Sequence, residues 1–221
     1  MSMPGIDTLT LIVSTLARGA LTAAQVALGA GLLAASLGLL LALAVVFVRQ
    51  RLLQLTIAAY VEWMRNVPAL AHLFVLYFGL ASVGVRLSPL TAAVIGLGLV
   101  GAAVLCEVFA AGLRCLHAGQ REAALAVGLT PAQALRSVLL PQMLRVTLPS
   151  LGNYASQLVK DTSIASAIAA PEVMFYARNL VTSTFETPLI YLTAMLLYAA
   201  MVLPISWAFA RLERRTAGGA R

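Results

Sequence analysis

The feature that most constrains this chain is a set of long stretches without any charged residue. Four stretches, residues 19–48, 66–85, 87–106 and 187–210, contain no Asp, Glu, Lys or Arg and have at least 20 residues each. About 20 apolar residues are enough for a helix to cross the hydrocarbon core of a bilayer. A fifth apolar stretch, about 146–171, is interrupted only by Lys160 and Asp161. The pattern predicts five membrane-spanning segments.

The composition also requires lipid as the solvent. Hydrophobic residues make up 61% of the 221-residue chain and charged residues only 10%, whereas soluble domains have about 45–50% apolar and about 25% charged residues. Backbone polar groups must be paired inside the bilayer, so the segments are helices or barrel strands. Their length and continuous apolar character favour helices, because barrel strands alternate over about ten residues. We therefore expect an all-α integral membrane protein.

The arginines predict the orientation. If five spans alternate, Arg18, Arg86 and Arg178 lie on one side of the membrane. The other arginines lie on the opposite side: Arg49, Arg51, Arg65, Arg114, Arg121, Arg136, Arg145, Arg211, Arg214, Arg215 and Arg221. Basic residues concentrate on the cytoplasmic side of membrane proteins. The N-terminus is expected outside and the C-terminus inside, and the net charge of +7 reflects orientation rather than nucleic-acid binding.

Proline and glycine predict the boundaries of the elements. We expect an outer N-terminal segment at 1–19, with a short helix over 6–17, then a transmembrane domain at 20–211 and a cytoplasmic tail at 212–221. Proline restricts its neighbour and lacks a backbone donor. The chain should therefore break at Pro68, open spans at Ser88-Pro89, at Pro149 and at Pro188, and bend at Pro204. A polar outer loop is expected over 172–187.

The longest segment between spans, 114–145, predicts two short helices. The first ends at Gly128, a residue type that favours helix termination. Thr130, Pro131 and Gln133 then form a capping-box pattern for a second helix, which we expect to stop at Pro141. This segment contains no paired carboxylates or cysteine–histidine cluster, so its shape favours docking to a protein over chemistry.

The same segment carries a recognisable motif. Glu122-Ala123-Ala124, three residues, Gly128, nine residues and Val138-Leu139-Leu140-Pro141 resemble the EAA signature of ABC importer permeases. Two further segments, 65–80 (RNVPALAHLFVLYFGL) and 151–168 (LGNYASQLVKDTSIASAI), resemble the polar amino acid branch of that family. Val67, His72 and His117 depart from the residues common there. The resemblance implies a five-helix transmembrane bundle of the type I ABC importer permease kind.

The resemblance also implies a set of partners. Such permeases pair with a second copy or a paralogue, receive an amino acid from an extracytoplasmic solute-binding protein, and dock a cytoplasmic ATP-binding subunit. ATP and Mg would be used by that subunit, because this chain has no P-loop motif and is not itself expected to be an enzyme. The expected location is the bacterial cytoplasmic (inner) membrane. The residues expected to couple to the ATPase are Glu122, Ala123, Ala124, Gly128, Leu140 and Pro141.

Charged and polar residues within the spans are candidates for the translocation path, since intramembrane charge is costly and faces the bundle interior or water. Glu107 and Asp161 can line the path and receive an ammonium or guanidinium group, or can form structural contacts between helices. The family resemblance runs through Lys160-Asp161-Thr162-Ser163 regardless of substrate, which favours the structural role for Lys160 and Asp161. His72 can contact a ligand or be a neutral, hydrogen-bonded histidine. Ser163 completes the path candidates, while Arg65 and Pro68 are assigned structural roles.

Other functions stay open at this point. An ion-coupled secondary transporter would need its own ion site, a membrane enzyme would need a catalytic constellation, and a scaffold needs neither. The two histidines and two cysteines of the chain have no metal-ligand spacing, so no metal or catalytic residue is predicted. Opines and other small zwitterions are alternative substrates.

Overall fold

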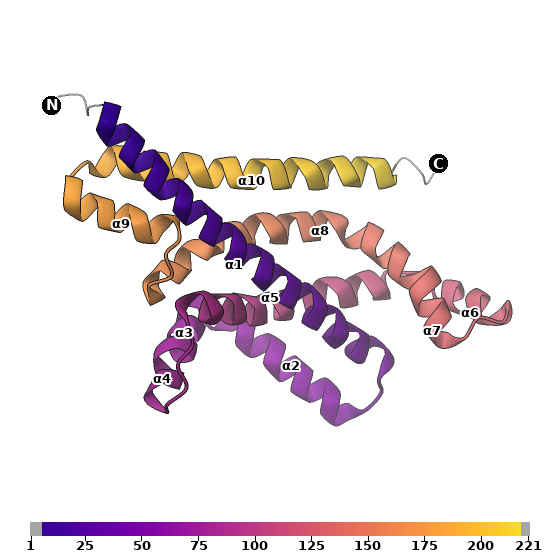
Figure 1. Ribbon diagram of the computed structural model, residues 1–221. Coiled ribbons are helices and arrows are strands. Elements are labelled where there is room, and N and C mark those ends of the chain that lie inside the picture. The colour runs from indigo at the N-terminus through magenta and orange to yellow at the C-terminus, as the bar shows by residue number, and fades with distance from the viewer. Residues whose placement is uncertain (1–5, 218–221) are drawn as a thin grey trace.

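The computed structural model describes residues 6–217, and every regular element in that range is a helix (Figure 1). The elements are α1 (Ile6–Phe47), α2 (Arg51–Asn66), α3 (Ala69–Phe74), a π-helical segment (Val75–Gly79), α4 (Leu80–Ser82), α5 (Pro89–Arg114), α6 (Ala118–Ala126), α7 (Pro131–Ala134), a second π-helical segment (Leu135–Leu139), α8 (Leu140–Asp161), a 3₁₀ segment (Thr162–Ile168), α9 (Val173–Thr184) and α10 (Thr187–Ala217). Residues 218–221 of the predicted tail, and residues 1–5, lie outside the described range.

Three helices are long and apolar enough to cross a membrane, namely α1, α5 and α10. Helix α2 and the run α3–α4 form a further candidate span that is bent by 103° at the predicted break, Pro68. Helix α8 has 22 residues, or about 33 Å at 1.5 Å per residue, but it is not among the helices apolar enough to cross a membrane, so three spans, or four with the bent pair, are found in the described residues where the sequence predicted five. The protein is an all-helical integral membrane protein.

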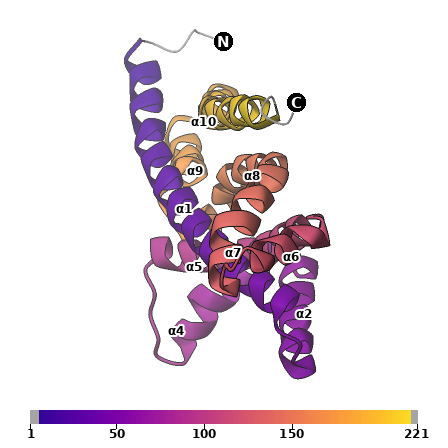
Figure 2. The ribbon, with the colours of Figure 1, turned by 90° about the vertical axis from the view of Figure 1, so that its right-hand side faces the viewer.

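Helices α1 and α5 form the most extensive contact in the described structure. Glycines make this close approach possible, as is usual between membrane helices. A Cβ atom on Gly98 would lie 2.6 Å from the Leu33 side chain, and one on Gly38 would lie 2.9 Å from Leu105 Cβ and 3.0 Å from the Ala102 carbonyl oxygen. The other long helices pack around this pair. Helix α8 contacts α5 and α10, and α2 contacts α5 (Figure 2).

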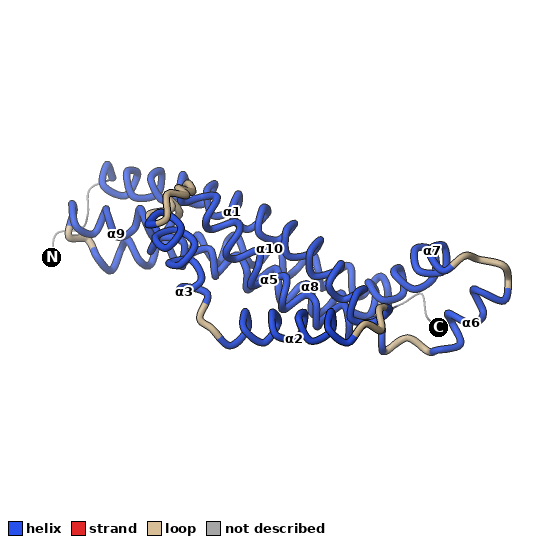
Figure 3. Tube along the Cα trace, turned by 90° about the horizontal axis from the view of Figure 1, so that it is seen from below, coloured by secondary structure: helices blue, strands red, loops and turns tan. Residues whose placement is uncertain are grey.

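The molecule has two ends with different structures. Helices α6 and α7 project at one end, which we call the hairpin end, while α9 and the start of α1 lie at the opposite end, which we call the N-terminal end (Figure 3). The expected separate helix over 6–17 is wrong, because α1 continues through Arg18 and Gly19 without a break. Gly19 instead permits close packing: a Cβ there would lie 2.7 Å from the Glu172 and Val173 backbone.

The predicted polar loop over 172–187 is also wrong, because most of it forms helix α9. Glu172 begins this helix as a fully buried residue whose carboxylate accepts hydrogen bonds from the backbone N–H groups of Met174 and Phe175, at 2.9 and 2.7 Å. The Tyr198 hydroxyl of α10 donates a third hydrogen bond, at 2.5 Å. The same carboxylate therefore caps α9 and joins it to α10, a role for which a buried acidic group at a helix N-terminus is well suited.

The prolines have mixed outcomes. Ser88 caps α5 ahead of Pro89, and Pro188 lies in the first turn of α10, as predicted. Pro141, however, does not stop the helical course, which runs on from α7 into α8 with Pro141 in the first turn of α8, and Pro149 lies inside α8 rather than at its start. The π-helical segment before Pro141 changes the hydrogen-bond pattern where the proline lacks a donor, which lets the helical course continue from α7 into α8.

The α1–α5 contact generates a stability prediction. Replacing Gly38 by Ala forces a Cβ against the backbone of α5, and overpacking of this kind costs about 1–3 kcal/mol. Thermal unfolding in detergent should show this loss. Gly79→Ala is the matched control, because its Cβ meets the nearest side chain at an ordinary 3.6 Å. Equal stability of both variants would contradict the assigned role of the α1–α5 contact.

Candidate functional site

Within the segment 114–145, helix α6, the turn 127–130 and helix α7 form a compact helical hairpin over residues 118–134. The His117 imidazole accepts a hydrogen bond from the Gly119 N–H at 3.2 Å and so caps the start of α6. At its end, the N–H groups of Gly128 and Leu129 bond to the carbonyls of Leu125 and Ala124, which is a Schellman motif. Gly128 has φ +88°, a left-handed conformation that favours glycine.

The second half of the hairpin begins as predicted. The Thr130 hydroxyl accepts from the Gln133 N–H and the Gln133 side chain accepts from the Thr130 N–H, completing the capping box. A hydrogen bond of 3.1 Å between the Gln142 and Gln120 side chains then ties α8 to α6. This hydrogen bond holds the start of α6 next to the start of α8.

The predicted coupling residues occupy different parts of this hairpin. Glu122, Ala123 and Gly128 are exposed on it, whereas Ala124 is buried at 5% exposure. Leu140 and Pro141 lie beyond the hairpin, at the start of α8, where Leu140 is half-buried and Pro141 exposed. The hairpin therefore presents Glu122 beside the exposed Arg121, Leu125 and Val127, while Ala124 allows α6 to pack closely on the following helix.

A groove runs along the wall between α5 and α8, and we call it the α5–α8 groove. It consists of two cavities of about 490 and 420 Å³ that share Val108 and Ser150 in their linings. The α5 side of the larger cavity is apolar: Leu97, Val100, Gly101, Val104 and Val108. Asp161 lies in the larger cavity and Glu107 in the smaller one, so the groove brings these two path candidates onto one surface.

The α8 side of the groove carries a polar stripe. Ser150, Asn153, Gln157 and Asp161 line it and recur at intervals that place them on one helix face. The Gln157 side-chain amide donates to the Asp161 carboxylate at 2.8 Å. Tyr154 also lines the groove, and its buried hydroxyl has no hydrogen-bond partner within residues 6–217. This arrangement offers a small polar molecule both hydrogen-bonding groups and a carboxylate.

Glu107 forms an ion pair with Arg65 of α2, and both side chains are about half exposed. This ion pair supports a structural role for Arg65. It also supports the interpretation of Glu107 as a structural contact between helices. Lys160, in contrast, is exposed and makes no ion pair with Asp161 in the described structure. Neighbouring residues of a helix point about 100° apart, which explains why the two do not neutralise each other.

The other two path candidates lie away from this groove. His72 lines a separate cavity of about 280 Å³ with Trp63, Val67 and Gly96. Both of its ring nitrogens are buried without a hydrogen-bond partner in residues 6–217, so neither of the two interpretations of His72 has a contact there that supports it. Ser163 lies in the 3₁₀ segment beyond α8, and its carbonyl accepts from the Ser166 hydroxyl at 2.7 Å.

Sequence reasoning missed Asn153, Tyr154 and Gln157. The sequence reasoning looked only for charged residues that interrupt an apolar stretch. Asn, Tyr and Gln carry no charge, so they do not interrupt such a stretch and were overlooked. The four-residue spacing of Asn153, Gln157 and Asp161 was the available signal, since these positions share a helix face. Among the described residues, no three His, Cys, Asp or Glu side chains gather as a metal site.

Gly128 provides a test of the hairpin geometry. A Cβ at this position meets no atom within 4 Å, so Gly128→Ala changes only the cost of the left-handed conformation, about 1–2 kcal/mol. We expect faster proteolysis within 118–134 while the unfolding temperature of the bundle is kept. Gly128→Asn is the matched variant, because Asn tolerates this conformation better. Equal cleavage of all three proteins would contradict the role of Gly128.

Several known proteins are similar to this chain in sequence, and solved structures are similar to it in architecture. A probable glutamine ABC transporter permease of Bacillus subtilis strain 168 is 36% identical over 157 residues, covering 71% of this chain and 73% of that protein. A glutamine transport system permease of Escherichia coli K12 is 32% identical and covers 71% and 72% of the two chains.

A crystal structure of an amino acid ABC transporter with histidines superposes on 97% of this chain and 100% of that chain, with a TM-score of 0.86 and 27% identity. The family of inner membrane components of binding-protein-dependent transport systems matches residues 9–218. That range includes all of the described helices except the first three residues of α1, and so contains the hairpin and the groove. The chain belongs to this family of inner membrane components of binding-protein-dependent transport systems.

Proposed function

We propose that this chain is the membrane-spanning subunit of an ATP-driven importer of polar amino acids. The observation that carries the proposal is the connection between the hairpin and the groove. The hairpin presents Glu122 on an exposed helix and joins α5 directly to α8. Those two helices wall the α5–α8 groove. A subunit that moves the hairpin therefore acts on both walls of a candidate path.

The chemistry of the groove supports a small polar solute. The Asp161 carboxylate suits an ammonium group, and Asn153 and Gln157 supply amide donors and acceptors for the rest of the molecule. The polar groups lie on the α8 wall of the groove, whereas the α5 wall of the larger cavity is apolar. The groove therefore suits a solute that has one polar and one apolar side. The names of the similar permeases, glutamine and other amino acid transporters, agree with this chemistry.

The proposal assigns the remaining roles to separate proteins. A cytoplasmic subunit binds ATP and Mg and docks on the hairpin, an extracytoplasmic protein delivers the amino acid, and a second copy or a paralogue completes the path. The membrane is the bacterial cytoplasmic membrane, with the hairpin end inside. The clustering of arginines at residues 114–145 and 211–221 supports this orientation.

Co-purification tests the docking role. We expect a P-loop ATPase to co-purify with the tagged chain from its native membrane, and the Glu122→Arg variant to lose it, because reversing an exposed charge disrupts a complementary interface. Glu213→Arg is the matched control, since it reverses another exposed glutamate outside the hairpin, on α10. Mass spectrometry with internal standards measures the ATPase recovered per permease.

The same material separates the alternatives. Uptake of glutamine, arginine, histidine or cystine by the reconstituted complex should require ATP and the receptor. Uptake driven by an ion gradient without ATP would replace the proposal with a secondary transporter, and absence of an ATPase from the wild-type complex would remove the docking role. Transport of an opine in preference to every amino acid would correct the substrate class.

Asp161 tests the path. If its carboxylate receives the ammonium group, Asp161→Asn should raise the KM for uptake by about tenfold, the equivalent of one charge-assisted hydrogen bond. The ATPase should still co-purify. Lys160→Gln is the matched control, because Lys160 is exposed and outside the groove lining. A fall in unfolding temperature with an unchanged KM would instead assign Asp161 a structural role.

A further inference from the structure

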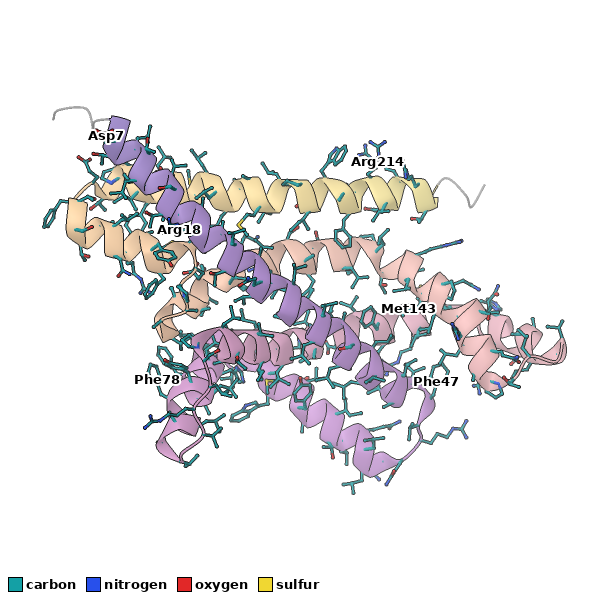
Figure 4. The ribbon with its side chains drawn as sticks, viewed as in Figure 1. Asp7, Arg18, Phe47, Phe78, Met143 and Arg214 are labelled. Atoms are coloured by element: carbon teal, nitrogen blue, oxygen red, sulfur yellow. The ribbon has the colours of Figure 1, made fainter. Side chains whose placement is uncertain are left out.

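One contact joins the hairpin to a helix that it does not follow or precede in the chain. The Arg121 guanidinium carbon, on α6, lies 5.8 Å from the centre of the Phe47 ring. This distance is typical of a cation–π interaction. Phe47 is the last residue of α1 (Figure 4), and Arg121 directly precedes Glu122 on the hairpin. The contact therefore reaches from the hairpin to the end of the longest helix.

Open space surrounds this contact. Two cavities of about 410 and 420 Å³ lie between the end of α1 and the hairpin region, and both are lined by Phe47, Arg121 and Leu139. Leu113 and Leu116 line the first cavity, whereas Leu43 and Leu135 line the second. Helix α6 packs on α7 and on the π-helical segment that follows it, but has no extensive packing on α1. Phe47 and Arg121 thus bridge a poorly filled region.

Within residues 6–217, Arg121 forms no salt bridge with a carboxylate. The ion pair of the described residues joins Arg65 and Glu107 instead. Another arginine–aromatic contact, Arg211 over Trp207 at 5.3 Å, joins residues one turn apart on α10. That contact cannot transmit movement between elements. The Arg121–Phe47 contact differs because its two residues belong to separate elements, α6 and α1.

We propose that Arg121 and Phe47 form a strut that passes movement of the hairpin to α1. Helix α1 has 42 residues, about 63 Å at 1.5 Å per residue. It packs along α5 and reaches α9 and α10 at the N-terminal end. A displacement applied at Phe47 therefore acts on the helix that links both ends of the molecule. This inference rests on the proposed function, in which an ATPase moves the hairpin.

The strut has a specific consequence for coupling. Movement reaches α5 and α8 through the chain itself, but reaches α1 at this end through side chains. Loss of the strut should therefore leave ATPase docking and ATP hydrolysis intact. A smaller part of the hairpin movement should then reach α1 in each ATPase cycle. Phe47 and Arg121 are positioning residues in this scheme, because neither needs to contact the transported solute or ATP.

The experiment measures glutamine transported per ATP hydrolysed by the complete complex in proteoliposomes. A partly exposed cation–π contact is weak, so Phe47→Leu should lower this ratio by about three- to fivefold. Arg121→Gln should lower it equally, and the double variant should be no worse than either single one. Phe47→Trp should keep the wild-type ratio because it retains an aromatic face. Trp207→Leu, which removes the contact within α10, is the control and should leave the ratio unchanged.

Other outcomes overturn the strut. An unchanged ratio in Phe47→Leu, or additive losses in the double variant, would show that the two residues do not act together. Loss of the ATPase from purified Phe47→Leu would assign the contact to docking instead. If Phe47→Leu does not fold, the exposed Arg121→Gln tests the same contact. Failure of the wild-type complex to contain an ATPase contradicts the proposed function itself, a result that co-purification distinguishes from failure of the strut.

Discussion

The close approach of α1 and α5 is the contact on which the rest of the structure depends. Helices in lipid gain little from hydrophobic burial against one another, so they associate through close packing of small residues and through polar contacts. In this chain Gly38 of α1 lies close to the backbone of α5, and Gly98 of α5 leaves room for the Leu33 side chain of α1. Helix α5 then carries one wall of the groove, and α1 carries Phe47. Both functional regions are therefore built on the same helix pair.

Interruptions of the helices place the site around this pair. The break at Pro68 turns the chain by 103° between α2 and α3, so that Arg65, just before the break, reaches Glu107 of α5. The positive φ of Gly128 reverses the chain between α6 and α7. The π-helical segment after α7 lets the chain pass Pro141 into α8. Each irregularity satisfies the backbone locally, which is required where water is scarce.

The sequence predicted features that depend on local chemistry. The Ser88 cap, the Gly128 turn and the Thr130–Gln133 capping box all appear in the structure, because each is set by a few neighbouring residues. It failed where tertiary packing decides. Gly19 is a packing contact rather than a break, and the buried Glu172 turns an expected loop into helix α9, because partners distant in the chain satisfy its carboxylate. Charge identified Asp161 and Glu107 as path candidates, but the sequence reasoning missed the amides of Asn153 and Gln157, whose spacing places them on the same helix face as Asp161.

In the proposed function, the hairpin both docks the ATPase and connects the two helices that wall the groove. The hairpin is the direct connection between α5 and α8, so in the proposed function a movement of the hairpin acts on both walls of the groove. Bistable packing of helices is the usual way in which small local shifts become large movements. Cavities lie beside Phe47 and Arg121, so at the hairpin end the contact between these two side chains is a defined link to α1, whereas glycines pack α1 closely on α5. In the proposed function, the close packing in the middle of the bundle holds the α5 wall of the groove in place, and the open space at the hairpin end leaves the hairpin room to move together with α1.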